Sequence, residues 1–474
     1  MTIGIFSNRR QILAGLLGSV LAGPVMAQDV LNAGLAVPPP RKPPPRPGRL
    51  IAGAGLDAEI DYAVFNPAGD LLEGRGADHP VAPASTLKVL TALYALDRLG
   101  PETRFQTQVM RAGSTLVLVG AGDPTLDTDQ LAELAGRTVT EWSGGPPERF
   151  CVIGEKLPYI AEISPGQDDY LTYNPAVSGI MLNFNRVHLS WKAGGGAMSL
   201  QARALRNSPP AYTIRAAAVG QGPLFSWREE GGREFWSVNR AGLRRAGSRW
   251  LPVRRPGLYT GDVFQTLCRA RGLVLPNPEV IQSELADMQL VASVDSPPLR
   301  DILRDMMEYS TNLTAEAVGL HASRQRDLVA SARDMQTWVE TRGIAGLDLW
   351  DHSGLSPDTR VTARAMAQII ATMGQDAGLP NLMKHVSLQD ARGRALNGDL
   401  RLDAKTGTLN FVSNLAGYGR IPARGQVVFA IFINDMARRA ATEGQELPAG
   451  VISWTHRAKF LQQQLVDSWV RDYG

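Results

Sequence analysis

The sequence predicts a mixed α/β body that is split by a large β-rich insertion. Three observations predict this fold class. Residues 83–101 have the pattern of one buried helix, residues 103–287 consist mainly of short β-like runs with many glycines and prolines, and the last third combines strand patterns with a helical stripe. A chain of 474 residues is long enough for two or three domains, each with its own hydrophobic core.

The first 27 residues predict an export signal. Arg9 and Arg10 form a basic start, an apolar stretch covers residues 12–21, and small residues lead to the expected cleavage point after Ala27. The paired arginines are also typical of a twin-arginine signal, so export to the periplasm by the general or the twin-arginine route is expected. No later segment is long and apolar enough to predict a transmembrane helix.

A proline-rich segment over residues 28–48 predicts an extended linker. After it, two short apolar runs on either side of a turn at residues 66–70 predict a pair of strands. Strong helical patterns return after the insertion. Residues 49–102 and 288–474 are therefore expected to form one discontinuous domain, and residues 103–287 an insertion of one or two subdomains.

A strand and a long helix are predicted near the end of the chain. The run QVVFAIFIND is apolar almost throughout, which is typical of a central strand. The tail has an apolar stripe at helical spacing, which predicts a helix that packs on the sheet rather than on a membrane. The stripe consists of Val451, Trp454, Ala458, Leu461, Leu465 and Trp469.

The charge of the chain excludes one class of partner. The net charge is only +3 and the basic residues are scattered, so no nucleic acid is expected as a partner. Only seven of the 49 basic residues are lysines. A lysine in this chain therefore indicates a function that arginine cannot perform, such as loss of the proton.

The segment PASTLKVLTALYALDRLGP places Ser85 and Lys88 one helical turn apart on the same face. Burial in an apolar helix lowers the pKa of a lysine, so that a neutral Lys88 could take the proton of the Ser85 hydroxyl. Free N–H groups in the first helical turn would also favour negative charge on the serine oxygen. The same spacing arises by chance in roughly one such chain in three, and the alternative is a solvated lysine on a surface helix.

A second motif, Lys405-Thr406-Gly407-Thr408, precedes the strand patterns of the last third. Gly407 would let another backbone or a ligand approach closely, while Lys405 supplies a cation and Thr406 a hydroxyl for a carboxylate. The alternative is a simple turn before a strand.

A serine and an asparagine separated by one residue occur twice. Ser237 and Asn239 lie in the insertion, whereas Ser310 and Asn312 lie between two helical patterns after it. The pattern is common by chance, so neither pair is informative alone. We select Ser310 and Asn312 because they lie in the returning domain, between the other two motifs.

In this order the three motifs resemble those of penicillin-recognising serine enzymes. The chain is similar to one branch, the class C low-molecular-mass penicillin-binding proteins, which are D-alanyl-D-alanine carboxypeptidase/endopeptidases. The blocks GAGDPTL, DHSGLSPDTRVTA and KTGTL and the long insertion after the first motif support the resemblance, which is loose inside the insertion. It implies a penicillin-binding-protein/β-lactamase-like serine transpeptidase fold, an antiparallel sheet with flanking helices.

The resemblance also implies catalytic roles. Ser85 would be the nucleophile that is acylated by the penultimate D-alanine, and Lys88 its general base, alone or through a relay by Ser310. Ser310 and Lys405 would help to pass a proton to the departing D-alanine. Asn312 would hold the amide of the substrate.

Substrate binding is implied for Thr406, Gly407 and Thr408. Lys405 and Thr406 would face the terminal carboxylate, and the backbone N–H groups of Ser85 and Thr408 would form an oxyanion hole. The expected partners are peptidoglycan stem peptides, with β-lactam antibiotics as covalent inhibitors. No cofactor and no metal are expected.

The chain departs from the family pattern at two places. His352 occupies a position where the family usually has glycine, and the usual aspartate-rich block is not found near residues 149–160. The second departure leaves the selectivity for substrate side chains, and any trimming of cross-links, open. Although Asp351 and Ser353 flank His352, no nucleophile elbow supports a Ser-His-Asp enzyme, so a surface histidine or one behind the site is expected.

Two alternatives to the carboxypeptidase function stay open. One is a β-lactamase or serine esterase on the same scaffold, and the other is a non-catalytic peptidoglycan-binding protein. The sequence also leaves open whether Cys151 and Cys268 form a disulfide. Neither cysteine has a neighbouring Cys or His at the spacing of a zinc site.

Overall fold

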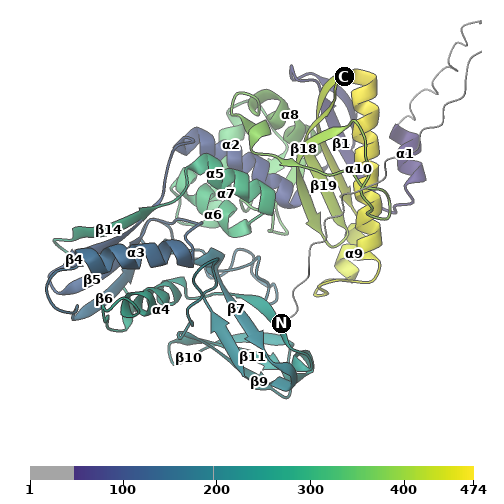
Figure 1. The fold of residues 1–474 in the computed structure, drawn as a ribbon. Helices are drawn as coiled ribbons and strands as arrows, with labels where there is room; N and C mark the ends of the chain where they lie inside the picture. Colours follow the sequence, from purple (N-terminus) through teal and green to yellow (C-terminus); the bar gives the residue numbers. More distant parts are fainter. Residues whose placement is uncertain (1–46, 196) are drawn as a thin grey trace, which may run out of the picture. The chain divides into compact units, whose positions relative to one another are not determined.

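The computed structural model describes residues 47–195 and 197–474, and a six-stranded antiparallel sheet organises the part that carries the three motifs (Figure 1). The prediction of a mixed α/β fold with an antiparallel sheet is confirmed. The strand order is β17 (Lys384–His385), β18 (Arg401–Leu409), β19 (Val412–Ile421), β20 (Gly425–Asn434), β1 (Glu59–Phe65) and β2 (Leu71–Arg75). β20 is central, as its apolar run predicts, and β1 and β2 are the predicted strand pair.

The sheet has an apolar core on each face because its strands alternate their side chains. On β1, Tyr62 and Val64 belong to one core, and Ala63 and Phe65 belong to the other. The helix α10 (Val451–Tyr473) packs on the first face against β19 and β20, and α8 (Ala363–Met373) packs on the second (Figure 1). All six residues of the predicted tail stripe are buried, so the packing of this helix on the sheet is confirmed.

The second face also carries the helices that hold the motifs. These are α2 (Lys88–Leu99), α5 (Leu299–Tyr309), α6 (Asn312–Ser323) and α7 (Leu328–Glu340). The Asp327 side chain caps α7 by accepting a hydrogen bond from the Ala330 N–H, and Thr362 caps α8 in the same way through Ala365. A small sheet consists of β15 (Leu347–Asp348), β16 (Arg360–Thr362) and β3 (Pro80–Val81). It joins the segment before α2, which contains β3, to the segment after α7, which contains β15 and β16.

In the described residues of the insertion, three sheets share one apolar core. The largest has the order β13 (Pro278–Val280), β6 (Arg149–Ile153), β5 (Thr115–Gly120), β4 (Gln106–Ala112) and β14 (Gln289–Asp295). The second sheet has the order β12 (Gly247–Pro252), β7 (Arg186–Trp191) and β8 (Met198–Gln201). The third has the order β10 (Phe225–Glu230), β11 (Arg233–Asn239) and β9 (Ile214–Val219). The helices α3 (Thr128–Glu141) and α4 (Pro256–Arg269) pack into the same core.

The predicted domain boundary at residue 288 differs from the strand pairing. β14 was expected in the discontinuous domain, but it pairs with β4 and so completes the sheet of the insertion. The pattern of the strand could not reveal this, because its partner lies far away in the sequence. The other boundaries stay predictions.

Cys151 and Cys268 are both free and buried. Cys151 lies on β6, and its side chain packs on the face of the sheet opposite to the face of its neighbours Phe150 and Val152. Cys268 packs with those neighbours on the other face. The sheet therefore separates the two thiols, and they do not form a disulfide.

The predicted signal, residues 1–27, and most of the predicted linker, residues 28–48, lie outside the described residues. The last two linker residues begin the short helix α1 (Pro47–Gly53). Within residues 47–195 and 197–474, no helix combines the length and the apolar character that crossing a membrane requires. Further short helices in the described residues include α9 (Met436–Ala441), η2 (Asn183–Asn185), η3 (Ala193–Gly195), η4 (Arg240–Leu243) and η5 (Leu379–Asn381).

Candidate active site

Ser85 lies in a tight turn rather than in the first turn of a continuous α-helix. The turn is the 3-10 helix η1 (Ala84–Leu87), and Lys88 begins α2 directly after it. Ala84 has a positive φ of 48°, and a Cβ on the neighbouring Gly354 would overlap the Ala84 carbonyl oxygen. The backbone before the serine is therefore held in an uncommon conformation by close packing, and this orients Ser85.

Lys88 is fully buried and its Nζ has three oxygen neighbours. They are Ser85 Oγ at 3.0 Å, Asn312 Oδ1 at 2.8 Å and the Ser353 carbonyl oxygen at 2.7 Å. An ammonium group has three hydrogens, so the charged form can donate to all three. A neutral amine would donate to the amide and the carbonyl, and its lone pair would face the Ser85 hydroxyl.

Two opposing effects set the pKa of Lys88. Burial lowers it to about 8, and the charges of the buried Glu316 and Asp351 oppose this by raising it. Glu316 accepts hydrogen bonds from the backbone N–H groups of His352 and Ser353, at 3.0 and 2.9 Å. Burial also raises the pKa of the Glu316 carboxyl. The lysine is thus poised between its charged and neutral forms near neutral pH.

Lys405 and Ser310 form a second pair of amine and hydroxyl. Lys405 Nζ lies 3.0 Å from Ser310 Oγ and 2.8 Å from the Thr406 carbonyl oxygen, and the lysine is 1% exposed. Burial holds the pKa of Lys405 well below its ordinary range, and the charges of Lys88 and Lys384 lower it further. Ser310 ends α5 in the left-handed conformation, with φ 59°, which turns the chain into α6 and Asn312.

Gly407 allows the strand β18 to approach the serine turn. A Cβ at Gly407 would lie 2.9 Å from the Pro83 carbonyl oxygen and 3.2 Å from the Ser85 nitrogen. On the paired strand β19, Asn414 donates from Nδ2 to the Ala82 carbonyl oxygen at 2.8 Å. The backbone nitrogen of Ser85 therefore lies close to the strand that carries the Lys-Thr-Gly motif.

The serine and asparagine pair of the insertion lies elsewhere. Ser237 accepts a hydrogen bond from Arg228 on the neighbouring strand, at 2.8 Å, and Asn239 caps η4. By contrast, Ser310 contacts Lys405 and Asn312 contacts Lys88. The structure thus brings together Ser85, Lys88, Ser310, Asn312 and Lys405, with half-buried Thr406 and exposed Thr408 on the same strand as Lys405.

His352 lies behind the site and not at the surface. It is fully buried, and its Nε2 is 2.6 Å from Ser331 Oγ. Burial lowers its pKa to about 3, so the imidazole is neutral near pH 7. A Cβ on Gly319 of α6 would overlap the imidazole, so that glycine provides the room for the ring. Its contacts do not include Ser85, which agrees with the expectation that it is no triad histidine.

Comparison with known families identifies the chain. The model of the D-Ala-D-Ala carboxypeptidase 3 (S13) family matches residues 67–456, which includes all three motifs. The chain belongs to this carboxypeptidase family. As a member it is a serine-type D-Ala-D-Ala carboxypeptidase, a hydrolase, and the resemblance to class C penicillin-binding proteins is confirmed.

Relatives match over most of their length. A carboxypeptidase of Mycobacterium tuberculosis is 28% identical, over 86% of this chain and 87% of the relative. A D-alanyl-D-alanine carboxypeptidase of Actinomadura is 25% identical, over 81% and 79%. The solved structure of penicillin-binding protein 4 of Haemophilus influenzae has a TM-score of 0.67 and 18% identity, and the match covers 89% of this chain and 99% of that one. This likeness confirms the fold.

Sequence reasoning missed the residues that surround Lys88. The Ser353 carbonyl oxygen accepts a hydrogen bond from the lysine, and Glu316 holds the backbone of that loop. Asp351 fixes the same loop, since its carboxylate accepts hydrogen bonds from the Leu355 N–H and the Thr359 hydroxyl. A signal existed, because Glu316 is an acidic residue within an apolar helical run, one turn after Asn312.

Proposed function

We propose that this family member is an exported D-Ala-D-Ala carboxypeptidase that cleaves peptidoglycan stem peptides through an acyl-enzyme on Ser85. The observation that carries the proposal is the contact of 3.0 Å between Lys88 Nζ and Ser85 Oγ, made by a fully buried lysine. A buried amine with a lowered pKa can take the proton of a neighbouring serine, which activates the serine as a nucleophile without a histidine.

The acylation step uses these groups in a fixed order. Neutral Lys88 takes the proton of the Ser85 hydroxyl, and Oγ forms a bond to the carbonyl carbon of the penultimate D-alanine. The carbonyl oxygen becomes an oxyanion, which the backbone N–H groups of Ser85 and Thr408 stabilise. The approach of β18 to the serine turn at Gly407 supports this arrangement.

The second group of residues acts on the leaving D-alanine. As the tetrahedral intermediate collapses, the carbon–nitrogen bond breaks and the leaving amine needs a proton, which Ser310 and Lys405 pass to it. Lys405 and Thr406 bind the terminal carboxylate, and Asn312 orients the substrate amide. Water then hydrolyses the acyl-enzyme and regenerates Ser85. The pairing of Lys405 Nζ with Ser310 Oγ supports this assignment.

Two further parts of the proposal concern location and inhibition. The signal pattern in residues 1–27 would direct the chain to the periplasm, where stem peptides occur. A β-lactam carbonyl would be attacked by the same serine, so penicillins are expected to acylate Ser85. Cross-linked peptides that end in the same D-alanyl bond would be cleaved by the same groups.

One experiment separates this function from its alternatives. The mature protein is incubated with a fluorescent penicillin and, separately, with a pentapeptide that ends in D-Ala-D-Ala. We expect a stable adduct on Ser85, located by mass spectrometry, and release of D-alanine. Ser85→Ala should lose both, whereas the control Ser237→Ala should retain both.

Other outcomes would contradict the proposal. Rapid turnover of the penicillin without release of D-alanine would indicate a β-lactamase. The absence of both adduct and turnover in a folded protein would indicate a peptidoglycan-binding protein without activity. Cleavage of a cross-linked dimer of the peptide, measured in parallel, gives the endopeptidase share of the activity.

A further inference from the structure

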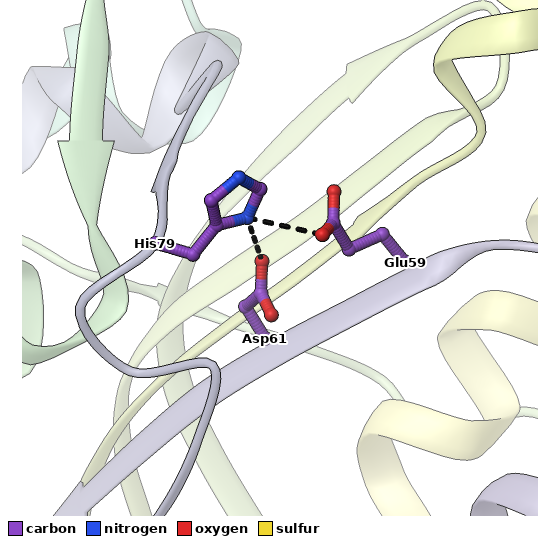
Figure 2. Close-up of side chains that lie close together, drawn as sticks. All are labelled: Glu59, Asp61 and His79. Atoms are coloured by element: carbon purple, nitrogen blue, oxygen red, sulfur yellow. Dashed lines mark hydrogen bonds and ion pairs between the residues drawn. The ribbon is translucent and has the colours of Figure 1, made fainter.

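A cluster of two carboxylates and one imidazole lies outside the catalytic site (Figure 2). Glu59 and Asp61 project from the start of β1, and His79 lies in the turn before β3. His79 Nδ1 is 3.1 Å from Glu59 Oε1 and 3.1 Å from Asp61 Oδ2. One ligand atom from each of the three residues lies within 4.8 Å of the others.

Asp61 is a buried carboxylate with too few partners. The residue is 5% exposed, and among the residues that the structure describes its side chain makes a hydrogen bond only with His79. A buried carboxylate needs more compensation than one imidazole that it shares with Glu59.

The backbone leaves room for the Asp61 carboxylate in this position. Gly76 has φ +52°, and a Cβ there would overlap the carboxylate. His79 in turn donates its backbone N–H to the Gly76 carbonyl oxygen at 3.0 Å, which closes the turn that brings the imidazole over Asp61. Any residue with a side chain at position 76 would displace the carboxylate or the turn.

Hydrogen bonding alone does not satisfy the three groups. Nδ1 of an imidazole carries at most one hydrogen, so it cannot donate well to two carboxylate oxygens at the same distance. A cation bound by the imidazole and the two carboxylates would satisfy both carboxylates. With metal–ligand bonds of about 2.0–2.2 Å, neighbouring ligand atoms lie roughly 3.0–3.5 Å apart, and the two observed distances of 3.1 Å fall in that range.

We propose that Glu59, Asp61 and His79 bind a divalent cation of the zinc type. One imidazole nitrogen and two carboxylate oxygens are a donor set that Zn²⁺ accepts, and water would complete the coordination because Glu59 and His79 are about half exposed. The positive charge of Arg75 also acts on Asp61, and its effect is smaller than that of His79. The two carboxylates together outweigh it.

The bound cation would brace the segment that leads to the nucleophile. Asp61 is fixed in the central sheet by its pairing with Phe432 of β20, whereas His79 lies in the segment that continues through β3 to Ser85. A cation that joins the two therefore ties this segment to the sheet. The role is structural and does not depend on the proposed peptidase chemistry.

The test uses the mature protein and two metal probes, Co²⁺ and Zn²⁺. The apo protein is prepared with a chelator, which is then removed by dialysis. We expect one equivalent of Co²⁺ to produce visible d–d absorption, and Zn²⁺ to displace it and to raise the Tm. His79→Gln and Glu59→Gln should lose the absorption and the Tm increase, while far-ultraviolet circular dichroism shows an unchanged fold.

The matched control is His385→Gln, because His385 is a half-exposed histidine that contacts a single carboxylate, Asp403. This variant should bind both metals as the wild type does. The proposal is overturned if the wild type shows no Co²⁺ absorption and no Tm increase at 1 mM Zn²⁺ (about a thousandfold above a micromolar Kd). Equal metal binding by His79→Gln and the wild type would overturn it as well.

Discussion

Nζ of Lys88 lies 2.8 Å from Oδ1 of Asn312, although 224 residues separate the two in the sequence. The whole insertion lies between them in the chain. The contact joins the first motif to the second, and the contact of 3.0 Å between Lys405 Nζ and Ser310 Oγ joins the second to the third. The site thus depends on residues from both sides of the insertion that meet at a buried lysine.

The first prediction concerns the substitution Lys88→Arg. Arginine keeps the positive charge but cannot lose its proton, so it cannot activate Ser85. We expect the rate of acylation by a fluorescent penicillin to fall by about 10²–10⁴-fold. Lys156→Arg, at an exposed site in the insertion, is the control and should react normally. Normal acylation of Lys88→Arg would exclude Lys88 as the base.

The second prediction is the pH dependence of acylation. In the proposed mechanism the neutral form of Lys88 is the active one, and burial lowers its pKa to about 8. The rate should therefore rise with pH and be half-maximal near pH 8, rather than near the ordinary lysine pKa of 10.5. Stopped-flow acylation between pH 6 and 10 measures the midpoint. A flat profile over this range would contradict the assignment.

The third prediction concerns Glu316 as a positioning residue. Its negative charge raises the pKa of Lys88, so Glu316→Gln should move the midpoint of the pH–rate profile to lower pH. The loss of a charged acceptor for two backbone N–H groups should also lower the free energy of unfolding by about 1–3 kcal/mol. The exposed Glu340→Gln should change neither. A lower stability without a shifted profile would indicate a purely structural role.

The fourth prediction is that Gly407→Ala impairs the site more than the fold. The new Cβ would lie 2.9 Å from the Pro83 carbonyl oxygen and 3.2 Å from the Ser85 nitrogen, so η1 or β18 must move. We expect acylation to slow by at least about tenfold, because an increase of about 1.4 kcal/mol in the activation free energy has that effect. Gly136→Ala on α3 meets only an ordinary contact with Arg271 and serves as control.

The fifth prediction concerns stability in acid. The pKa of His352 is lowered from 6.5 to about 3 by burial, so below pH 6.5 the unfolded chain binds a proton that the native state does not. The contribution of this histidine is complete above pH 6.5 and is lost as the pH falls towards 3. His352→Gln should reduce the slope of the unfolding free energy by about 1.4 kcal/mol per pH unit between pH 6 and 4.

Chemical denaturation at several pH values measures this slope. The exposed His385→Gln is the control, because it removes an imidazole that is not buried. An equal slope for wild type and His352→Gln would show that the imidazole takes up its proton in the native state.

Local patterns in the sequence were sufficient for several elements. The apolar run after Pro83, the β20 run and the tail stripe predicted buried elements, because helical and strand spacing are local properties. They were not sufficient for the boundary at β14 or for the turn at Ala84. Both depend on contacts with distant segments, namely the pairing with β4 and the packing against Gly354.

By itself, the sequence determined the three motifs, their order and the unusual lysine in an apolar helix, because residue type and spacing can be read without coordinates. Only the tertiary structure decided which serine and asparagine pair joins Lys88, how deeply the lysine is buried, and that Glu316 holds the loop behind it. The pKa of an amine depends on desolvation and on charges a few ångströms away, and these follow from folding of the whole domain.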